Sequence, residues 1–150
     1  MEIEKGNKVR RNGFTTIEVI SILVILGILS AVAISKVAST ATYSLVAEAD
    51  VLRMHLRYAQ YRALSDDVSW GMSFTGNTYT LLRGATATYN LPNDSSATHT
   101  LANGISFSPT PGGVSFDEWG SPGTADITIT LSSSGGSQSI PITKNTGFIP

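Results

Sequence analysis

The sequence contains no cysteine among its 150 residues. This absence excludes structural disulfides, thiol nucleophiles, cysteine-ligated zinc and iron–sulfur clusters. Charged residues are also scarce, because they make up 14% of the chain, whereas an average soluble domain has about 25%. The formal net charge is −1, so the chain lacks the excess of Lys and Arg with which proteins bind nucleic acid. The length fits one modest domain rather than two.

Helix-breaking residues are missing from most of the N-terminal half. No proline occurs before Pro92, and no glycine occurs between Gly27 and Gly71. Since these two residues disfavour helices most strongly, the sequence predicts one long helix from Phe14 to about Ser65. The helix divides by composition into an apolar first part, residues 14–35, and a mixed second part, residues 36–65.

The apolar first part is long enough to cross a membrane. Its 22 residues contain a single charge, Glu18, and as a helix they would span about 33 Å, close to the roughly 30 Å of a bilayer's hydrocarbon core. Basic residues in front of the segment predict that the N-terminus stays in the cytoplasm. They are Lys5, Lys8, Arg10 and Arg11.

Two simple interpretations of this segment compete. A cleaved secretory signal would explain the small residues of Ala31-Val32-Ala33, but its apolar region normally has only about 7–15 residues. A plain membrane anchor explains the length and the flanking charges. It does not explain Glu18, because an acidic residue at the centre of a membrane helix costs about 2.5–3.5 kcal/mol, and less near an end.

A third interpretation accounts for the acidic residue. Residues 13–18, G-F-T-T-I-E, resemble the signal of type IV prepilins, in which a glycine, an aromatic residue and a spaced glutamate precede an apolar block. The resemblance implies that a prepilin peptidase removes residues 1–13 by cutting between Gly13 and Phe14, and then methylates the new amine of Phe14. Glu18 would pair with that amine on a neighbouring subunit, and a buried carboxylate is tolerable beside such a cation. We favour this interpretation.

The second part of the helix carries one apolar stripe. Its members recur at alternating spacings of three and four residues, which is the pattern of an amphipathic helix. We therefore expect this part to pack on the core of a globular head. The stripe consists of Leu45, Ala49, Leu52, Leu56, Ala59 and Ala63.

From residue 66 onward the pattern changes to short alternating segments separated by Gly, Pro and Ser, which is typical of antiparallel strands. A hairpin is expected around the turn Gly76-Asn77, and residues 85–100 are expected to form a long loop. The other predicted strands are 104–108, 113–116, 127–131, 139–143 and a final strand-like run, 146–150. The predicted fold is α+β, with a long N-terminal helix packed on an antiparallel β head, residues 66–150.

No catalytic, cofactor or metal site is predicted. His55 and His99 have no partner at metal-ligand spacing, and no nucleotide-binding or hydrolase motif occurs. Asp117-Glu118 fits a solvated turn better than a calcium site, which needs six to eight oxygens. Both tryptophans are expected in the core. Lys144 is the only basic residue after position 83, so we expect no nucleic-acid partner.

Two further segments narrow the resemblance. Residues 56–60, L-R-Y-A-Q, and residues 116–122, F-D-E-W-G-S-P, resemble minor pilins of the MSHA class and the related pseudopilin H and FimT group. The resemblance implies a non-enzymatic minor pilin or pseudopilin that primes a filament or sits at its tip. Its implied partners are prepilin peptidase, other pilins and the assembly platform. Its implied location is the bacterial inner membrane, with the head in the periplasm, and then the filament.

The physical argument alone does not separate a minor from a major subunit, or a type IV pilus from a type II secretion pseudopilus. Two alternatives of other classes also stay open. One is an adhesive minor pilin with a surface-recognition head, which an exposed aromatic patch would favour. The other is a membrane-anchored periplasmic binding domain that does not assemble.

Overall fold

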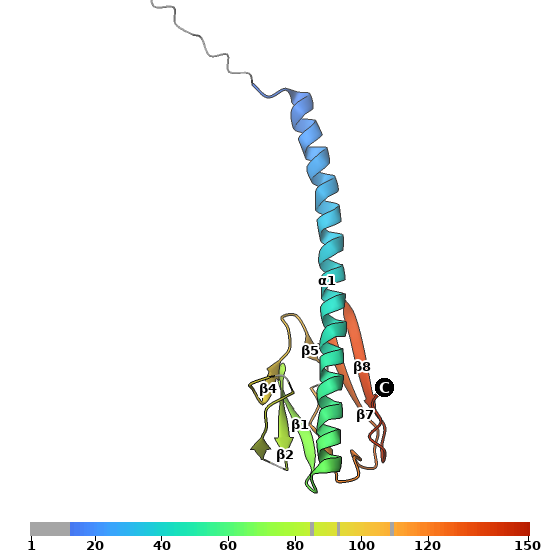
Figure 1. Cartoon of the computed structure of the whole chain (residues 1–150). Coiled ribbons are helices and arrows are strands. Elements are labelled where there is room, and N and C mark those ends of the chain that lie inside the picture. Colours follow the sequence, from blue (N-terminus) through green and yellow to red (C-terminus); the bar gives the residue numbers. More distant parts are fainter. Residues whose placement is uncertain (1–12, 85, 93, 109) are drawn as a thin grey trace, which may run out of the picture. The chain divides into compact units, whose positions relative to one another are not determined.

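The computed structural model describes residues 13–84, 86–92, 94–108 and 110–150, and only the backbone of 34–41. The described residues form one helix and eight strands (Figure 1). By its contacts the chain divides into two units, with the boundary between Lys36 and Val37. The elements are α1 (Thr16–Ser65), β1 (Trp70–Thr75), β2 (Thr78–Arg83), β3 (Ala87–Thr88), β4 (Thr98–Thr100), β5 (Ser106–Phe107), β6 (Val114–Phe116), β7 (Ile127–Ser133) and β8 (Gly136–Ile142).

Helix α1 begins two residues later than predicted, because Thr15 caps it. The Glu18 N–H lies 3.1 Å from the Thr15 carbonyl oxygen and 3.4 Å from its Oγ1. A threonine at this position satisfies one of the free N–H groups at a helix N-terminus. The other end of the helix, at Ser65, agrees with the prediction.

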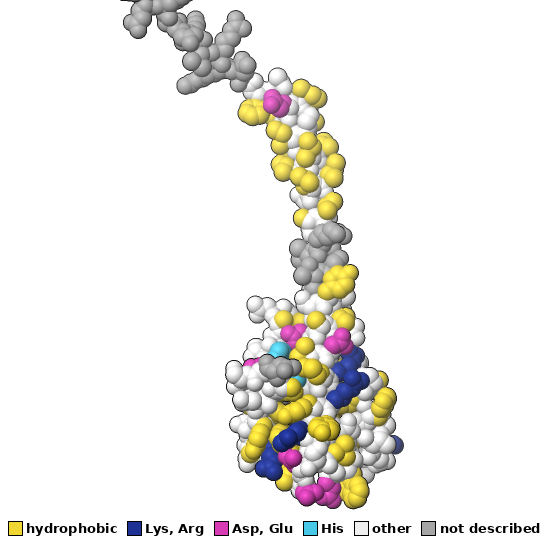
Figure 2. Space-filling model, viewed as in Figure 1, with side chains coloured by type: hydrophobic (Ala, Val, Ile, Leu, Met, Phe, Trp, Pro, Cys, Tyr) yellow, Lys and Arg dark blue, Asp and Glu magenta, His cyan; other side chains and the backbone are white. Residues whose placement is uncertain are grey.

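The first part of α1 is apolar on all sides. The segment Thr16–Ala33 has a mean hydropathy of 2.4, and none of it is buried within the chain. By length and composition it is able to cross a membrane. Figure 2 shows hydrophobic side chains along the visible face of this segment, with an acidic side chain near its start.

The second part of α1 packs on the head as predicted. All six residues of the predicted stripe are at most 1% exposed. They join one hydrophobic core with side chains of both β-sheets, and α1 lies over the two sheets in Figure 1. Burial of this stripe therefore provides the main contact that holds the second part of α1 in the head.

The strands form two antiparallel sheets. The first has the order β3-β2-β1-β6, with β4 also pairing with β2, and the second has the order β5-β7-β8. The predicted hairpin is confirmed as β1 and β2, paired from Trp70 with Arg83 to Thr75 with Thr78. Gly76 adopts a φ of 58° in its turn, a conformation that glycine accepts at no steric cost.

Two expectations for the head are wrong. The predicted loop over residues 85–100 contains β3 and β4, which both pair with β2. The predicted final strand does not form, because residues 146–149 bind α1 instead. Gln60 Nε2 donates to the carbonyl oxygens of Thr146 and Gly147 at 3.1 and 3.0 Å, and Arg57 donates to that of Ile149 at 3.0 Å.

Candidate functional site

The predicted processing site lies open at the start of α1. Gly13 would have nothing within 4 Å of an added Cβ, and Phe14 is 75% exposed. No described segment therefore covers the Gly13–Phe14 bond. The basic residues Lys5, Lys8, Arg10 and Arg11 lie outside the described residues.

Glu18 stands in the first turn of α1, three residues after its cap. A threonine followed three residues later by glutamate is the pattern of a capping box, in which both side chains bond backbone N–H groups. Only the threonine half is formed here, since the Glu18 carboxylate is exposed and has no ion-pair or hydrogen-bond partner among the described residues. Its charge is favourable at a helix N-terminus and is still available to an outside cation.

The fold brings the only two histidines of the chain together. Their ring centres are 6.0 Å apart, and both rings lie against Tyr79. His55 Nδ1 is 2.8 Å from the Tyr79 hydroxyl, and His99 pairs with Tyr79 across β2 and β4. His99 Nε2 is 3.0 Å from a carboxylate oxygen of Glu48 on α1. Neither partner is near its histidine in sequence, so no local pattern could have predicted this cluster.

Burial disfavours the charged form of His55. His55 is 4% exposed, and desolvation, with a smaller effect of nearby His99, lowers its pKa below the ordinary 6.5. Burial also raises the pKa of Tyr79. Among the described residues no group of three or more His, Cys, Asp or Glu side chains could hold a metal ion. The cluster therefore acts as a polar tie between α1 and the first sheet.

Two carboxylates of the head, those of Asp66 and Asp117, accept hydrogen bonds from nearby groups. Asp66 accepts from Arg62 Nη2 and from Trp70 Nε1, both at 3.1 Å. Asp117 Oδ1 accepts the N–H groups of Trp119 and Ser121 at 3.0 and 2.8 Å. Both carboxylates therefore fix local backbone and side chains.

Trp70 is buried as predicted, but the same expectation for Trp119 is wrong, since Trp119 is 78% exposed. The residues around Trp119 could have corrected it, because aspartate, glycine and proline within a few positions favour an exposed turn. Three other large apolar side chains lie exposed near the C-terminal end of α1. We call the four together the end patch: Tyr61, Leu64, Trp119 and Phe148.

Contacts of Gln60 hold the chain neighbours of Trp119 and Phe148 beside α1. Gln60 Nε2 donates to the carbonyl oxygens of Gly120 and Gly147 at 2.9 and 3.0 Å, which are the chain neighbours of Trp119 and Phe148. Gly120 also packs against Leu64, since a Cβ at Gly120 would lie 3.2 Å from Leu64 Cδ2. The patch thus lies beside α1, on the helix side of the head.

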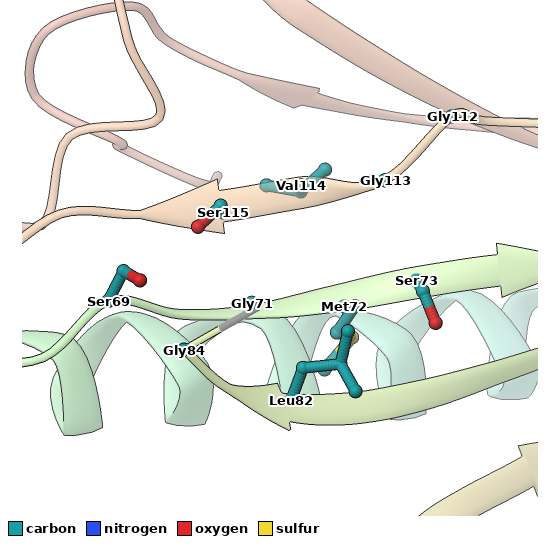
Figure 3. A pocket seen from close by; sticks show the side chains of 10 residues that line it. All are labelled: Ser69, Gly71, Met72, Ser73, Leu82, Gly84, Gly112, Gly113, Val114 and Ser115. Atoms are coloured by element: carbon teal, nitrogen blue, oxygen red, sulfur yellow. The ribbon is translucent and has the colours of Figure 1, made fainter. Parts of the chain in front are cut away.

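The opposite face of the first sheet carries a hollow of about 420 Å³ (Figure 3). Since Trp70, Met72 and Phe74 belong to the core, the alternate residues Gly71 and Ser73 point to the other face of β1. No charged side chain lines the hollow. Its lining residues are Ser69, Gly71, Met72, Ser73, Leu82, Gly84, Gly112, Gly113, Val114 and Ser115.

The hollow depends on glycine. A Cβ at Gly71 would lie 2.1 Å from the Val114 carbonyl oxygen and 2.8 Å from Ser115 Cα. Strands β1 and β6 can therefore approach this closely only because Gly71 has no side chain. Serine hydroxyls and backbone groups supply the polar atoms of its wall, and Leu82 supplies an apolar surface.

The fold matches that of a solved type IV minor pilin. Two crystal structures of FimU from Pseudomonas aeruginosa align with the chain. One has a TM-score of 0.53 and 16% identity and covers 73% of this chain and 88% of the other. The second has a TM-score of 0.50 and 18% identity, and the alignment covers 71% of this chain and 90% of the other. The α+β fold predicted from the sequence is thereby confirmed as a pilin fold. No protein-family model matches the sequence, and no curated protein matches it either.

Proposed function

We propose that this chain is a non-enzymatic minor pilin or pseudopilin that assembles through the first part of α1 into a type IV pilus or a type II secretion pseudopilus. One observation carries the proposal: an apolar helical segment, none of it buried in the chain, precedes a head with the fold of a type IV minor pilin. Apolar side chains on every side of a helix require lipid or other helices around them.

Processing precedes assembly in this proposal. Prepilin peptidase cuts between Gly13 and Phe14 and methylates the Phe14 amine, after which residues 1–13 are lost. Until extraction by the assembly platform, the chain spans the inner membrane with its head in the periplasm. The openness of Gly13 and Phe14 supports access by a peptidase.

Glu18 then selects the register between subunits. Its carboxylate has no partner among the described residues, while the Phe14 amine of a neighbour supplies a cation. In an apolar bundle an unpaired carboxylate is costly, so subunits that pair the two charges are strongly favoured. Family resemblance favours a subunit that primes the filament at its tip.

The experiment follows the full chain in a host with active prepilin peptidase. Mass spectrometry is expected to find a chain that begins at Phe14 and carries one added methyl group. An unmodified chain that begins at Met1 would refute the processing step.

Glu18→Gln is expected to insert into the membrane but to be lost from sheared filaments, because it keeps the size and removes the charge. Glu18→Asp is the matched control that keeps the charge, and it is expected to retain part of the assembly. If Glu18→Gln assembles normally, the proposed pairing is wrong.

An adhesive head is the second candidate, because the end patch exposes three aromatic side chains. Exposed apolar patches of this kind mark binding surfaces. An adhesive role predicts that Trp119→Ala removes filament attachment to a surface while leaving the number of filaments unchanged. Equal attachment by the variant and the wild type would exclude it.

A further inference from the structure

One short segment of chain packs against the histidine cluster at the edge of the first sheet. We call residues 94–100, which end in β4, the strap. Its β4 pairs with Thr78–Thr80 of β2 (Figure 1), and no residue of the strap is buried. The leucines that follow and precede it in the chain, Leu101 and Leu91, belong to the hydrophobic core. The strap is therefore the part of this region that can move while the core keeps its packing.

The hydrogen bonds of His55 require a neutral ring. Its Nδ1 lies 2.8 Å from the Tyr79 hydroxyl, and the ring also has a hydrogen bond with the Pro92 backbone. Since proline has no N–H, the ring must donate to the Pro92 carbonyl oxygen. A neutral imidazole has one donor nitrogen and one acceptor nitrogen, so Nδ1 accepts from the Tyr79 O–H. Both hydrogen bonds are thus made without placing a charge in this buried site.

A proton on His55 disrupts this arrangement. Both ring nitrogens then donate, so the Tyr79 hydroxyl has to turn its own proton away from Nδ1, and it has no other hydrogen-bond partner among the described residues. The new charge also faces His99, whose ring centre is 6.0 Å away. Because a buried charge without a partner is costly, the protonated ring favours an opening that admits water.

The other groups that face His55 act in the opposite direction. Asp94 in the strap, the Pro92 carbonyl and Glu48 on α1 all favour its charged form, but each has less effect than burial or His99. Glu48 also lies 3.0 Å from His99 Nε2, and this contact becomes an ion pair when His99 carries a proton. The closed strap is therefore compatible with a charged His99 but not with a charged His55.

We propose that the strap is an acid-operated switch: when His55 takes up a proton, residues 94–100 separate from α1 and β2 while the core of the head stays folded. The opening brings water to His55 and Tyr79, and it leaves the backbone groups of Thr78–Thr80 unpaired. An unpaired strand edge is a template for another strand, so acid exposes a binding edge that β4 covers at neutral pH. The switch belongs to the head alone and does not depend on assembly into a filament.

Amide hydrogen exchange of the full chain in detergent, read by mass spectrometry, tests the switch because it reports local opening. Exchange is measured at about pH 7.5 and about pH 5, and each rate is divided by the intrinsic rate at that pH. In the open form the pKa of His55 returns to the ordinary 6.5, so acid favours opening by at most about 30-fold at pH 5. We expect the strap and Thr78–Thr80 to exchange about 10- to 30-fold faster, whereas β7 and β8 should change by less than about twofold.

His55→Gln is the decisive variant, because glutamine has a donor and an acceptor group but cannot take up the proton. It is expected to remove the acid-dependent rise in the exchange of the strap. His99→Gln is the matched control, since it leaves His55 in place, and it should keep the rise. If His55→Gln does not fold, a pH series on the wild type decides. The rise should then begin below about pH 6.5 and stay within about tenfold per pH unit, as for a single proton.

Three results would overturn the switch. The first is a strap whose exchange does not rise in acid. The second is an equal rise in His55→Gln and in the wild type, which would mean that His55 does not control the opening. The third is an equal rise in the strap and in β7 and β8, which would mean that acid unfolds the whole head.

Discussion

The two parts of α1 use the same kinds of apolar residue in opposite ways. In Thr16–Ala33 none of the residues is buried within the chain, whereas the predicted stripe of the second part is at most 1% exposed. The second part has its partners in the chain, namely the strands of both sheets. The first part is not buried against any described residue, and its proposed partners are lipid or other helices.

The largest expected effect is a difference in the free energy of unfolding between substitutions in the two parts of α1. Leu56 is fully buried, and Leu56→Ala should lower the free energy of unfolding by about 2–5 kcal/mol, because it leaves a cavity in the core. Leu23 in the first part is 63% exposed, so Leu23→Ala should change the free energy of unfolding by about 0.5 kcal/mol or less. Denaturation of the full chain in detergent, followed by tryptophan fluorescence, measures both. Equal losses would contradict the comparison.

A second pair of variants tests how closely the head is packed. Gly71→Ala should lower the free energy of unfolding by about 1–3 kcal/mol, the usual range for overpacking, because its Cβ would overlap the Val114 carbonyl oxygen. Gly112→Ala is the control and should be nearly neutral, since the space around it is open. The same denaturation measurement applies. A neutral Gly71→Ala would mean that β6 can move away from β1 freely.

The histidine cluster predicts that acid weakens the head. Because the pKa of His55 is lower in the folded chain than the ordinary 6.5, the unfolded chain binds more protons below that pH. The stability that neutral His55 contributes is therefore fully present above about pH 6.5 and falls as the pH drops further. Denaturation at about pH 7.5 and about pH 5 should show the loss, and His55→Gln should reduce it. The groups that face His55 are Glu48, Tyr79, the Pro92 carbonyl, Asp94 and His99.

The comparison of the variant with the wild type isolates the contribution of His55. An equal pH dependence in His55→Gln and in the wild type would show that the loss does not come from His55.

The smallest expected effect is on the outward face of α1. Asp50 accepts from Arg53 at 2.6 Å, but its side chain is 65% exposed. Ion pairs in such positions contribute about 0–1 kcal/mol, so Asp50→Asn should lower the free energy of unfolding by about 0.5 kcal/mol or less. A loss as large as that of Leu56→Ala would show that this face also supports the head.

The sequence could predict features whose residues are close together in the chain, but not contacts between residues that are far apart in it. The stripe from Leu45 to Ala63 and the hairpin around Gly76 were predictable because their patterns are local. The cluster of His55, Tyr79 and His99 was not, because its members come from separate elements. The final run, 146–150, looked like a strand but binds Gln60, which no periodicity reveals.

The same limit applies to the candidate site. Gly13, Phe14 and Glu18 form one continuous motif, so the sequence names them without a fold. The residues that line the hollow lie in or beside β1, β2 and β6, and only the sheet pairing brings them together. Residue type alone suggested burial for Trp119, while the fixed turn at Asp117 holds it in solvent.

The hydrogen bonds that Gln60 and Arg57 donate to the C-terminal residues also affect when the head can finish folding during synthesis. The carbonyl groups that these side chains bind belong to residues 87 and 92 positions further along the chain, and Ile149 next to them is 3% exposed in the core. During synthesis these two contacts can therefore form only after Gly147 and Ile149 have emerged. Contacts of such long sequence separation form slowly. A chain halted before residue 146 would present an unfinished head to chaperones and proteases.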